Sequence, residues 1–96
     1  MFQLPESITV FNSEEVLESL SKYINNIIFG QNSNEQVILN ARELTDIDGA
    51  GLQLLLSAYK TCELKNIPYS ITELNDEIMA LLDITGTKVI VEREEA

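Results

Sequence analysis

TDIDGAGL, residues 45–52, joins an apolar run typical of a strand, Val37-Ile38-Leu39, to the apolar run Leu54-Leu55-Leu56 of a predicted helix. A chain that leaves a strand and enters a helix exposes backbone N–H groups and a few side chains at one end of a sheet, where α/β proteins usually bind their ligands. We call this turn, residues 45–51, the rim. We expect Asp48 to accept N–H bonds at the start of the helix, and Gly49 and Gly51 to permit the tight turn.

The chain before the rim predicts one strand region, one helix and one strand. Residues 2–10 alternate apolar and polar across Pro5, as in a strand pair or a bent edge strand. Asn12 or Ser13 then caps a helix, with Glu15 at the capping-box spacing from Asn12. Gly30 ends that helix, residues 31–34 form a polar loop, and residues 36–40 form a buried strand. The expected apolar stripe of the helix comprises Val16, Leu17, Leu20, Ile24, Ile27 and Ile28.

The helix after the rim has one residue that does not fit its pattern. At 100° per residue its apolar side comprises Leu52, Leu55, Leu56, Tyr59 and Cys62, and its polar side Gln53, Ser57, Lys60 and Thr61. Leu54 falls on the polar side, so we expect it to be exposed near the rim.

The remaining residues predict a strand at 67–71, a short helix capped by Asn75 and continuing to Asp83, a C-terminal cap at Gly86, and a last strand at 88–91. Strands that alternate with helices indicate right-handed crossovers. We therefore expect an α/β fold in a single domain, residues 1–96. Its sheet should be mixed but mostly parallel, with four to five strands and helices packed around it.

Composition excludes several functions. The net charge of −10 argues against nucleic acid and anionic membrane surfaces, which bind clusters of lysine and arginine. No apolar run is long enough to insert in a membrane and the first residues are not basic, so we expect a cytoplasmic protein. Histidine is absent and Cys62 is the only cysteine. We therefore expect no metal site and no cofactor. We expect Cys62 to be an inert thiol in the core.

The acidic rim suggests three kinds of chemistry. Asp46-Ile47-Asp48-Gly49 has the form D-x-D-G of aspartate-nucleophile phosphohydrolases, but residues 42–45 separate it from the apolar strand, whereas those enzymes place the first aspartate at the strand end. The glycines could cradle a phosphate, although two aspartates oppose an anion and no lysine accompanies them. A divalent cation wants more oxygen ligands than Asp46 and Asp48 supply. Because no nucleophile–base pair is visible, we expect no enzyme and no catalytic residue.

Two motifs give the chain a specific resemblance. The run from Val37 to Asn40, followed by LTDIDGAGL at residues 44–52, resembles the signature of the STAS domain family, named for sulfate transporters and anti-sigma-factor antagonists. Leu82-Asp83-Ile84-Thr85-Gly86 resembles the family's third-helix motif before its last strand. The resemblance covers essentially the whole chain.

The resemblance implies a regulatory protein-binding module. In the bacterial anti-sigma antagonists, a partner kinase phosphorylates a serine or threonine at the start of the second helix, and the phosphate switches off binding in the control of transcription. The matching position is Ala50, which cannot carry a phosphate. Thr45 or Ser57 could replace that hydroxyl, although both also suit structural roles. Relatives without the phosphosite occur in chemosensory and lipid-transport complexes.

These observations predict a non-enzymatic protein that binds an anti-sigma factor or kinase-like protein, a chemosensory component or a transporter component. The predicted contact residues are Asp48, Gly49, Ala50, Gln53, Leu54 and Ser57. We expect Leu54→Asp to abolish partner capture from a lysate and to leave the fold intact.

Overall fold

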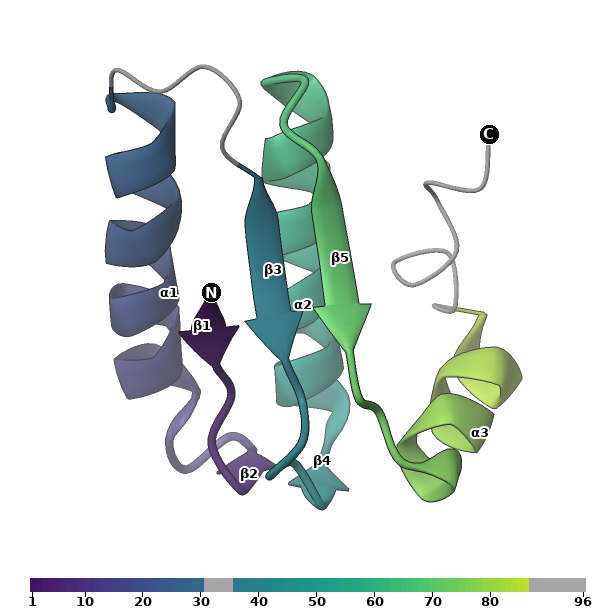
Figure 1. The fold of residues 1–96 in the computed structure, drawn as a ribbon. Helices are drawn as coiled ribbons and strands as arrows, with labels where there is room; N and C mark the ends of the chain where they lie inside the picture. The colour runs from purple at the N-terminus through teal and green to yellow at the C-terminus, as the bar shows by residue number, and fades with distance from the viewer. Residues whose placement is uncertain (31–35, 87–96) are drawn as a thin grey trace.

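A computed structural model describes residues 1–30 and 36–86, in which three helices accompany five short strands (Figure 1). The predicted polar loop at 31–34 and the predicted strand at 88–91 lie outside the described residues. In chain order the elements are β1 (Phe2–Gln3), β2 (Ser7–Ile8), α1 (Ser13–Ile28), β3 (Val37–Asn40), β4 (Asp46–Ile47), α2 (Gly49–Leu64), β5 (Tyr69–Thr72) and α3 (Asp76–Thr85).

All strand pairs in the described residues are parallel, which confirms the predicted α/β fold with parallel strands. They form two sheets, one with strand order β1-β3-β5 and one that pairs β2 with β4. In the larger sheet, Leu39 lies between Phe2 of β1 and Ile71 of β5. The N-terminal region forms two short strands that do not pair with each other: β1 pairs with β3 in the larger sheet, and after Leu4 the chain turns so that β2 pairs with β4 in the smaller one.

The short strand β4 was not predicted, because its two residues lie inside the acidic turn. The backbone N–H groups of Thr45 and Asp46 both donate to the Glu6 carbonyl oxygen, at 2.8 and 3.2 Å. The Asp48 N–H donates to the Ile8 carbonyl at 3.3 Å. A segment from the N-terminus therefore fixes the backbone of the rim.

Helix α2 lies behind β3 and β5, and α1 packs beside it (Figure 1). The fully buried Tyr69 of β5 donates its hydroxyl to the Leu55 carbonyl of α2 at 3.2 Å, and burial raises the pKa of this phenol. Cys62 is also fully buried, as predicted for a core thiol. The core between sheet and helices includes Leu4, Ile8, Leu20, Val37, Leu39, Leu44, Leu55, Cys62, Tyr69 and Leu82.

The predicted exposure of Leu54 is wrong. Its side chain is only 6% exposed and belongs to the core, as does Ala58 one turn later. The prediction assumed one buried stripe, but α2 packs against the sheet on one side and α1 on another, so its buried arc is wider. Conversely, Leu52 and Leu56 are only partly buried, and Leu17 of the predicted α1 stripe is 48% exposed.

The helix ends agree with prediction where the cap is local. Asn75 accepts from the Ile78 N–H at 2.8 Å, and Gly86 caps α3 with a left-handed φ of 76°. The predicted side-chain cap of α1 is wrong: Asn12 occupies the N-cap position but makes no capping bond. Its side chain instead accepts from Thr9 N–H and donates to the Ser7 carbonyl, both at 2.8 Å, which ties the turn after β2 together.

Within residues 1–30 and 36–86, none of the helices combines the length and apolarity that a membrane crossing needs.

Candidate functional site

The Asp48 side chain joins two segments that lie far apart in the sequence. Its Oδ1 accepts from the Gly51 N–H at 3.1 Å, which is the predicted cap of α2. Its Oδ2 accepts from the Val10 N–H at 3.0 Å, a contact that the sequence did not predict. Asp48 therefore holds the turn before α1 against the first turn of α2.

Val10 and Phe11, which lie at this contact, are both exposed apolar residues, and Phe11 is 95% exposed.

Both carboxylate oxygens of Asp48 accept hydrogen bonds from backbone N–H groups. The side chain therefore has a structural role and is poorly placed to act as a nucleophile.

These hydrogen bonds make stability depend on pH. The bond from Val10, followed by that from Gly51, lowers the pKa of Asp48 below its ordinary value of 3.8. A lowered pKa in the folded state means that the ionised carboxylate stabilises the fold above the unfolded pKa, and that this contribution is lost as pH falls through the folded value. We expect Asp48→Ala to lower the melting temperature at neutral pH, and the difference from the wild-type protein to shrink below a pH of about 4.

Thermal unfolding followed by circular dichroism at a series of pH values measures this difference. Asp46→Ala is the control, because Asp46 lies on the same rim with an exposed side chain. A gap between Asp48→Ala and wild type that stays constant down to acid pH contradicts the assigned role of the carboxylate.

Gly49 and Gly51 have different surroundings, which corrects the prediction that both are needed to permit the turn. A Cβ at Gly51 would overlap the Ile8 carbonyl oxygen and lie 2.6 Å from Ile47 Cγ1. A Cβ at Gly49 would meet nothing within 4 Å, and neither residue has a positive φ. Gly51 is therefore required by the close approach of α2 to β2, whereas the geometry at Gly49 accepts other residues.

Four of the six predicted contact residues line one groove with the start of α1. The groove has a volume of about 350 Å³, and we call it the N-terminal groove. From α2 it is lined by Ala50, Gln53, Leu54 and Ser57, and from α1 by Ser13, Glu14 and Leu17. Asp48 and Gly49 do not line it and lie on the rim beside it. The sequence missed the α1 side because helical periodicity does not tell which helix packs beside which.

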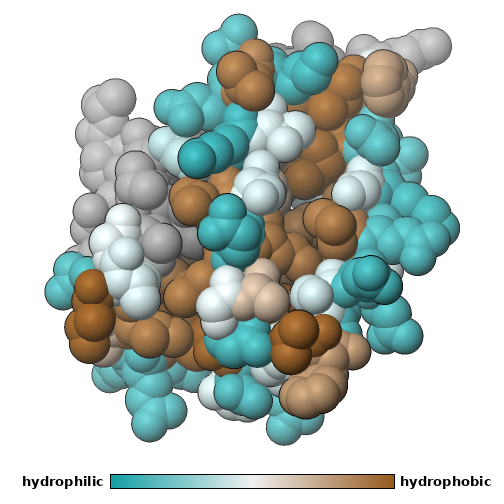
Figure 2. All heavy atoms as spheres, turned by 180° about the vertical axis from the view of Figure 1, so that it is seen from behind, coloured by the Kyte–Doolittle hydropathy of each residue, from teal (hydrophilic) through white to brown (hydrophobic). Residues whose placement is uncertain are grey.

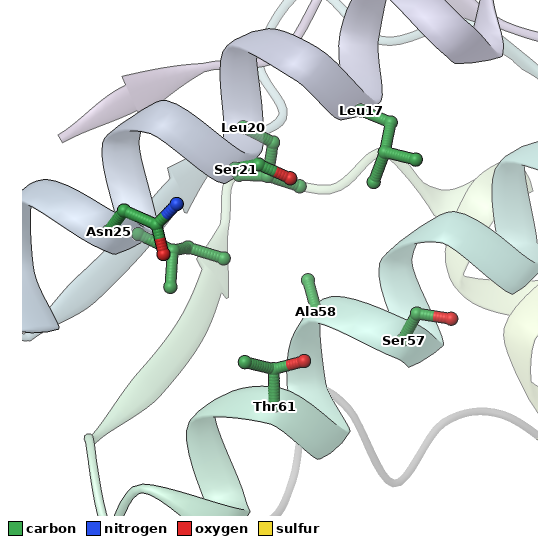
Figure 3. A pocket seen from close by; sticks show the side chains of 8 residues that line it. Leu17, Leu20, Ser21, Asn25, Ser57, Ala58 and Thr61 are labelled. Carbon is green, nitrogen blue, oxygen red and sulfur yellow. The ribbon is translucent and has the colours of Figure 1, made fainter.

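A smaller hollow of about 140 Å³ continues between the same two helices (Figure 3). Leu17 and Ser57 line both hollows and so connect them. The floor of the smaller one is apolar, with Leu20, Ile24 and Ala58, and its edges carry Ser21, Asn25 and Thr61. Of the described residues that line it, none is charged. Together the two hollows form one long depression between α1 and α2.

The face that carries these helices has apolar patches among hydrophilic side chains (Figure 2). Leu17 contributes an exposed apolar side chain there, whereas Leu54 is covered by its neighbours and reaches the groove only as part of its lining. Such a surface suits contact with another macromolecule, because burying the apolar side chains around a depression removes them from water and lowers the free energy of the complex.

The two hydroxyls proposed as substitutes for the family phosphosite lie in different places. The Thr45 hydroxyl is on the rim and donates to the Glu6 carbonyl at 3.4 Å. Ser57 is exposed and stands where the two hollows meet.

Among the described residues, no three His, Cys, Asp or Glu side chains are grouped as a metal site requires. Asp46 is two residues before Asp48 in the sequence. Both carboxylate oxygens of Asp48 accept hydrogen bonds from backbone N–H groups.

Comparison with known proteins agrees with the fold and the rim motif. A search of curated proteins found no match. The sequence model of the STAS domain family matches residues 1–95, which is nearly the whole chain and includes both motifs that carried the resemblance. This protein belongs to the STAS domain family.

Proposed function

We propose that this protein is a non-enzymatic regulatory module that binds a protein partner through the N-terminal groove and the adjoining rim. The observation that carries the proposal is the convergence of Ala50, Gln53, Leu54 and Ser57 with the exposed Leu17 of α1 around one groove. A STAS domain implies protein interactions, and a partly apolar groove beside a rigid, hydrogen-bonded rim supports such a contact.

The proposed module is not controlled by phosphorylation at the usual position. Ala50 is half-buried at the edge of the groove, and its methyl group offers no oxygen for phosphoryl transfer. A dianion at that position would lie beside Glu14 and against apolar side chains, where repulsion and lost hydration would weaken docking. With alanine there, the binding surface stays permanently in the equivalent of the unphosphorylated state.

Three partner classes suit this role: an anti-sigma factor or kinase-like protein, a chemosensory component, or a subunit of a lipid-transport complex. The proteins encoded next to this one would separate them, since an adjacent kinase-like anti-sigma factor favours the first. The remaining enzymatic alternative, phosphate-ester hydrolysis by Asp46 and Asp48, is disfavoured by the two N–H bonds that Asp48 accepts.

We expect Ser57→Arg to abolish capture of the partner from a lysate of the source organism. Ser57 is exposed where both hollows meet, so arginine fits the fold but fills the groove with bulk and charge. The expected loss of affinity is at least about tenfold. Immobilised wild-type and variant proteins are compared by mass spectrometry of the bound fraction.

Leu64→Arg is the matched control, because it places the same side chain on α2 at an 83% exposed position outside the groove. Equal capture by Ser57→Arg and wild type would falsify the proposed surface. The same incubation with ATP, followed by intact-mass measurement, tests the unswitched state. A phosphate on Thr45 or Ser57 overturns that part of the proposal.

A further inference from the structure

We infer that the depression between α1 and α2 takes an amphipathic helix of the partner that carries lysine or arginine at the end nearest the rim. This inference rests on the proposed function and adds the chemistry of the occupant. It follows from how charge and apolar surface are distributed along the two hollows.

The lining of the depression changes from acidic to uncharged along its length. Among the residues that the structure describes, its only charged lining residue is Glu14, at the N-terminal end, and Asp48 lies beside that end just before Ala50. The described lysines and arginines are Lys22, Arg42, Lys60 and Lys65, and none of them lines either hollow. The smaller hollow offers only apolar and uncharged polar side chains.

The net sign at the rim end is negative even when the helix dipoles are included. The N-termini of α1 and α2 each carry a partial charge of about +0.5. Glu14 in the first turn of α1 and Asp48 at the cap of α2 place two carboxylates at this end, whereas Glu15 lines a separate hollow with Phe2 and Pro5. Since the hydrogen bonds from Val10 and Gly51 favour the charged form of Asp48, this end attracts a cation.

The apolar part of the depression requires apolar side chains from the occupant. Leu17 is 48% exposed and lies between the hollows, with Leu54 in one lining and Leu20, Ile24 and Ala58 in the other. A groove between two helices suits a third helix, which offers apolar residues three and four positions apart and keeps its own backbone hydrogen-bonded. A second copy of this chain is a poor occupant, because its acidic surface and net charge of −10 oppose the acidic end of the groove.

The test uses three synthetic peptides of about 18 residues, long enough to form a helix once bound. The first has leucines at helical spacing and lysines elsewhere, the second has the same leucines with glutamates, and the third has the lysines with serine in place of leucine. Each is titrated into the ¹⁵N-labelled protein, and amide shifts give the affinity and the site. We expect the first peptide to shift residues 13–17 and 50–58, the second not to bind, and the third to bind weakly without a defined site.

Two variants test the assigned contacts. Leu17→Gln keeps the size of the side chain but removes apolar contact, and should weaken the first peptide about fivefold. Glu14→Gln removes a charge at the rim end and should weaken it about two- to fivefold. The controls are Leu64→Gln and Glu63→Gln, which make the same changes on α2 outside the depression.

Shifts spread over the acidic surface, equal for the first and third peptides, would overturn the inference, because general charge attraction would then account for the binding. Ultracentrifugation of the protein alone tests for a second copy; a dimer that Leu17→Gln dissociates also overturns it. If Ser57→Arg abolishes partner capture while the first peptide does not bind at the groove, the proposed function stands and the helical cationic occupant is wrong. If the peptide binds there but Ser57→Arg leaves capture unchanged, the proposed function fails instead.

Discussion

Gly51→Ala is expected to unfold this protein or to destabilise it severely. The added Cβ would overlap the Ile8 carbonyl oxygen and crowd Ile47, so a backbone atom of β2 would have to move. That carbonyl also accepts the Asp48 N–H, and its displacement would break the link between β2 and the rim. Overpacking against backbone in the core costs at least about 3 kcal/mol here, at the upper end of the usual range.

A loss of that size lowers the melting temperature of a domain of this length by about 12 °C or more. Gly49→Ala is the matched control two residues earlier. A Cβ there meets nothing within 4 Å, and alanine favours the helix by up to about 1 kcal/mol, so this variant should melt at or above the wild-type temperature. Thermal unfolding of both variants decides the matter. A Gly51→Ala protein that melts together with wild type would show that α2 and β2 do not approach as closely as described.

Leu54→Asp is the second large effect, and the structure reverses what the sequence predicted for it. Leu54 is 6% exposed, so the substitution removes a core side chain and introduces a carboxylate among apolar neighbours. Loss of a buried leucine alone costs about 2–5 kcal/mol. A buried, unpaired charge adds to that, and the sum approaches the total stability of about 5–14 kcal/mol expected for a chain of this length.

We therefore expect Leu54→Asp to show no cooperative thermal transition and poorly dispersed amide resonances. Leu64→Asp makes the same change on α2 at a position that is 83% exposed, and should remain folded with stability close to wild type. If Leu54→Asp instead folds normally, the contact between α1 and α2 at this position is wrong. Loss of partner capture by this variant would follow from unfolding alone, whereas Ser57→Arg changes an exposed residue and therefore tests the binding surface.

The sequence correctly predicted those helix caps whose hydrogen-bond partners lie within a few residues along the chain. Asn75 and Gly86 cap α3 as expected, because the groups that they satisfy are within a few residues. Asn12 also precedes a helix, yet its side-chain amide bonds to backbone groups of Ser7 and Thr9 in the preceding turn. A capping pattern considers only the helix that follows and does not include these competing partners. Leu54 was misjudged for a related reason: a helical wheel has one buried side, whereas α2 has two packed neighbours.

The sequence named the α2 residues of the groove but not those of α1. Four residues that the sequence named on α2 line the groove, and Asp48 caps the helix as expected. The other lining residues, Ser13, Glu14 and Leu17, come from α1, and the bond from Val10 to Asp48 spans 38 positions. Such long-range neighbours are set by the packing of the whole chain, and no spacing within a single motif encodes them.

The hydrogen bond between Val10 and Asp48 has a consequence for shortened forms of the chain. Backbone groups of Glu6, Ile8 and Val10 hold the rim through hydrogen bonds. A protein that lacks these residues loses those bonds, which fix the start of α2. Such a truncation should lose partner binding even where α1 and α2 still form. For the same reason, a bound partner should slow amide hydrogen exchange at residues 6–10, which support the rim without lining the groove.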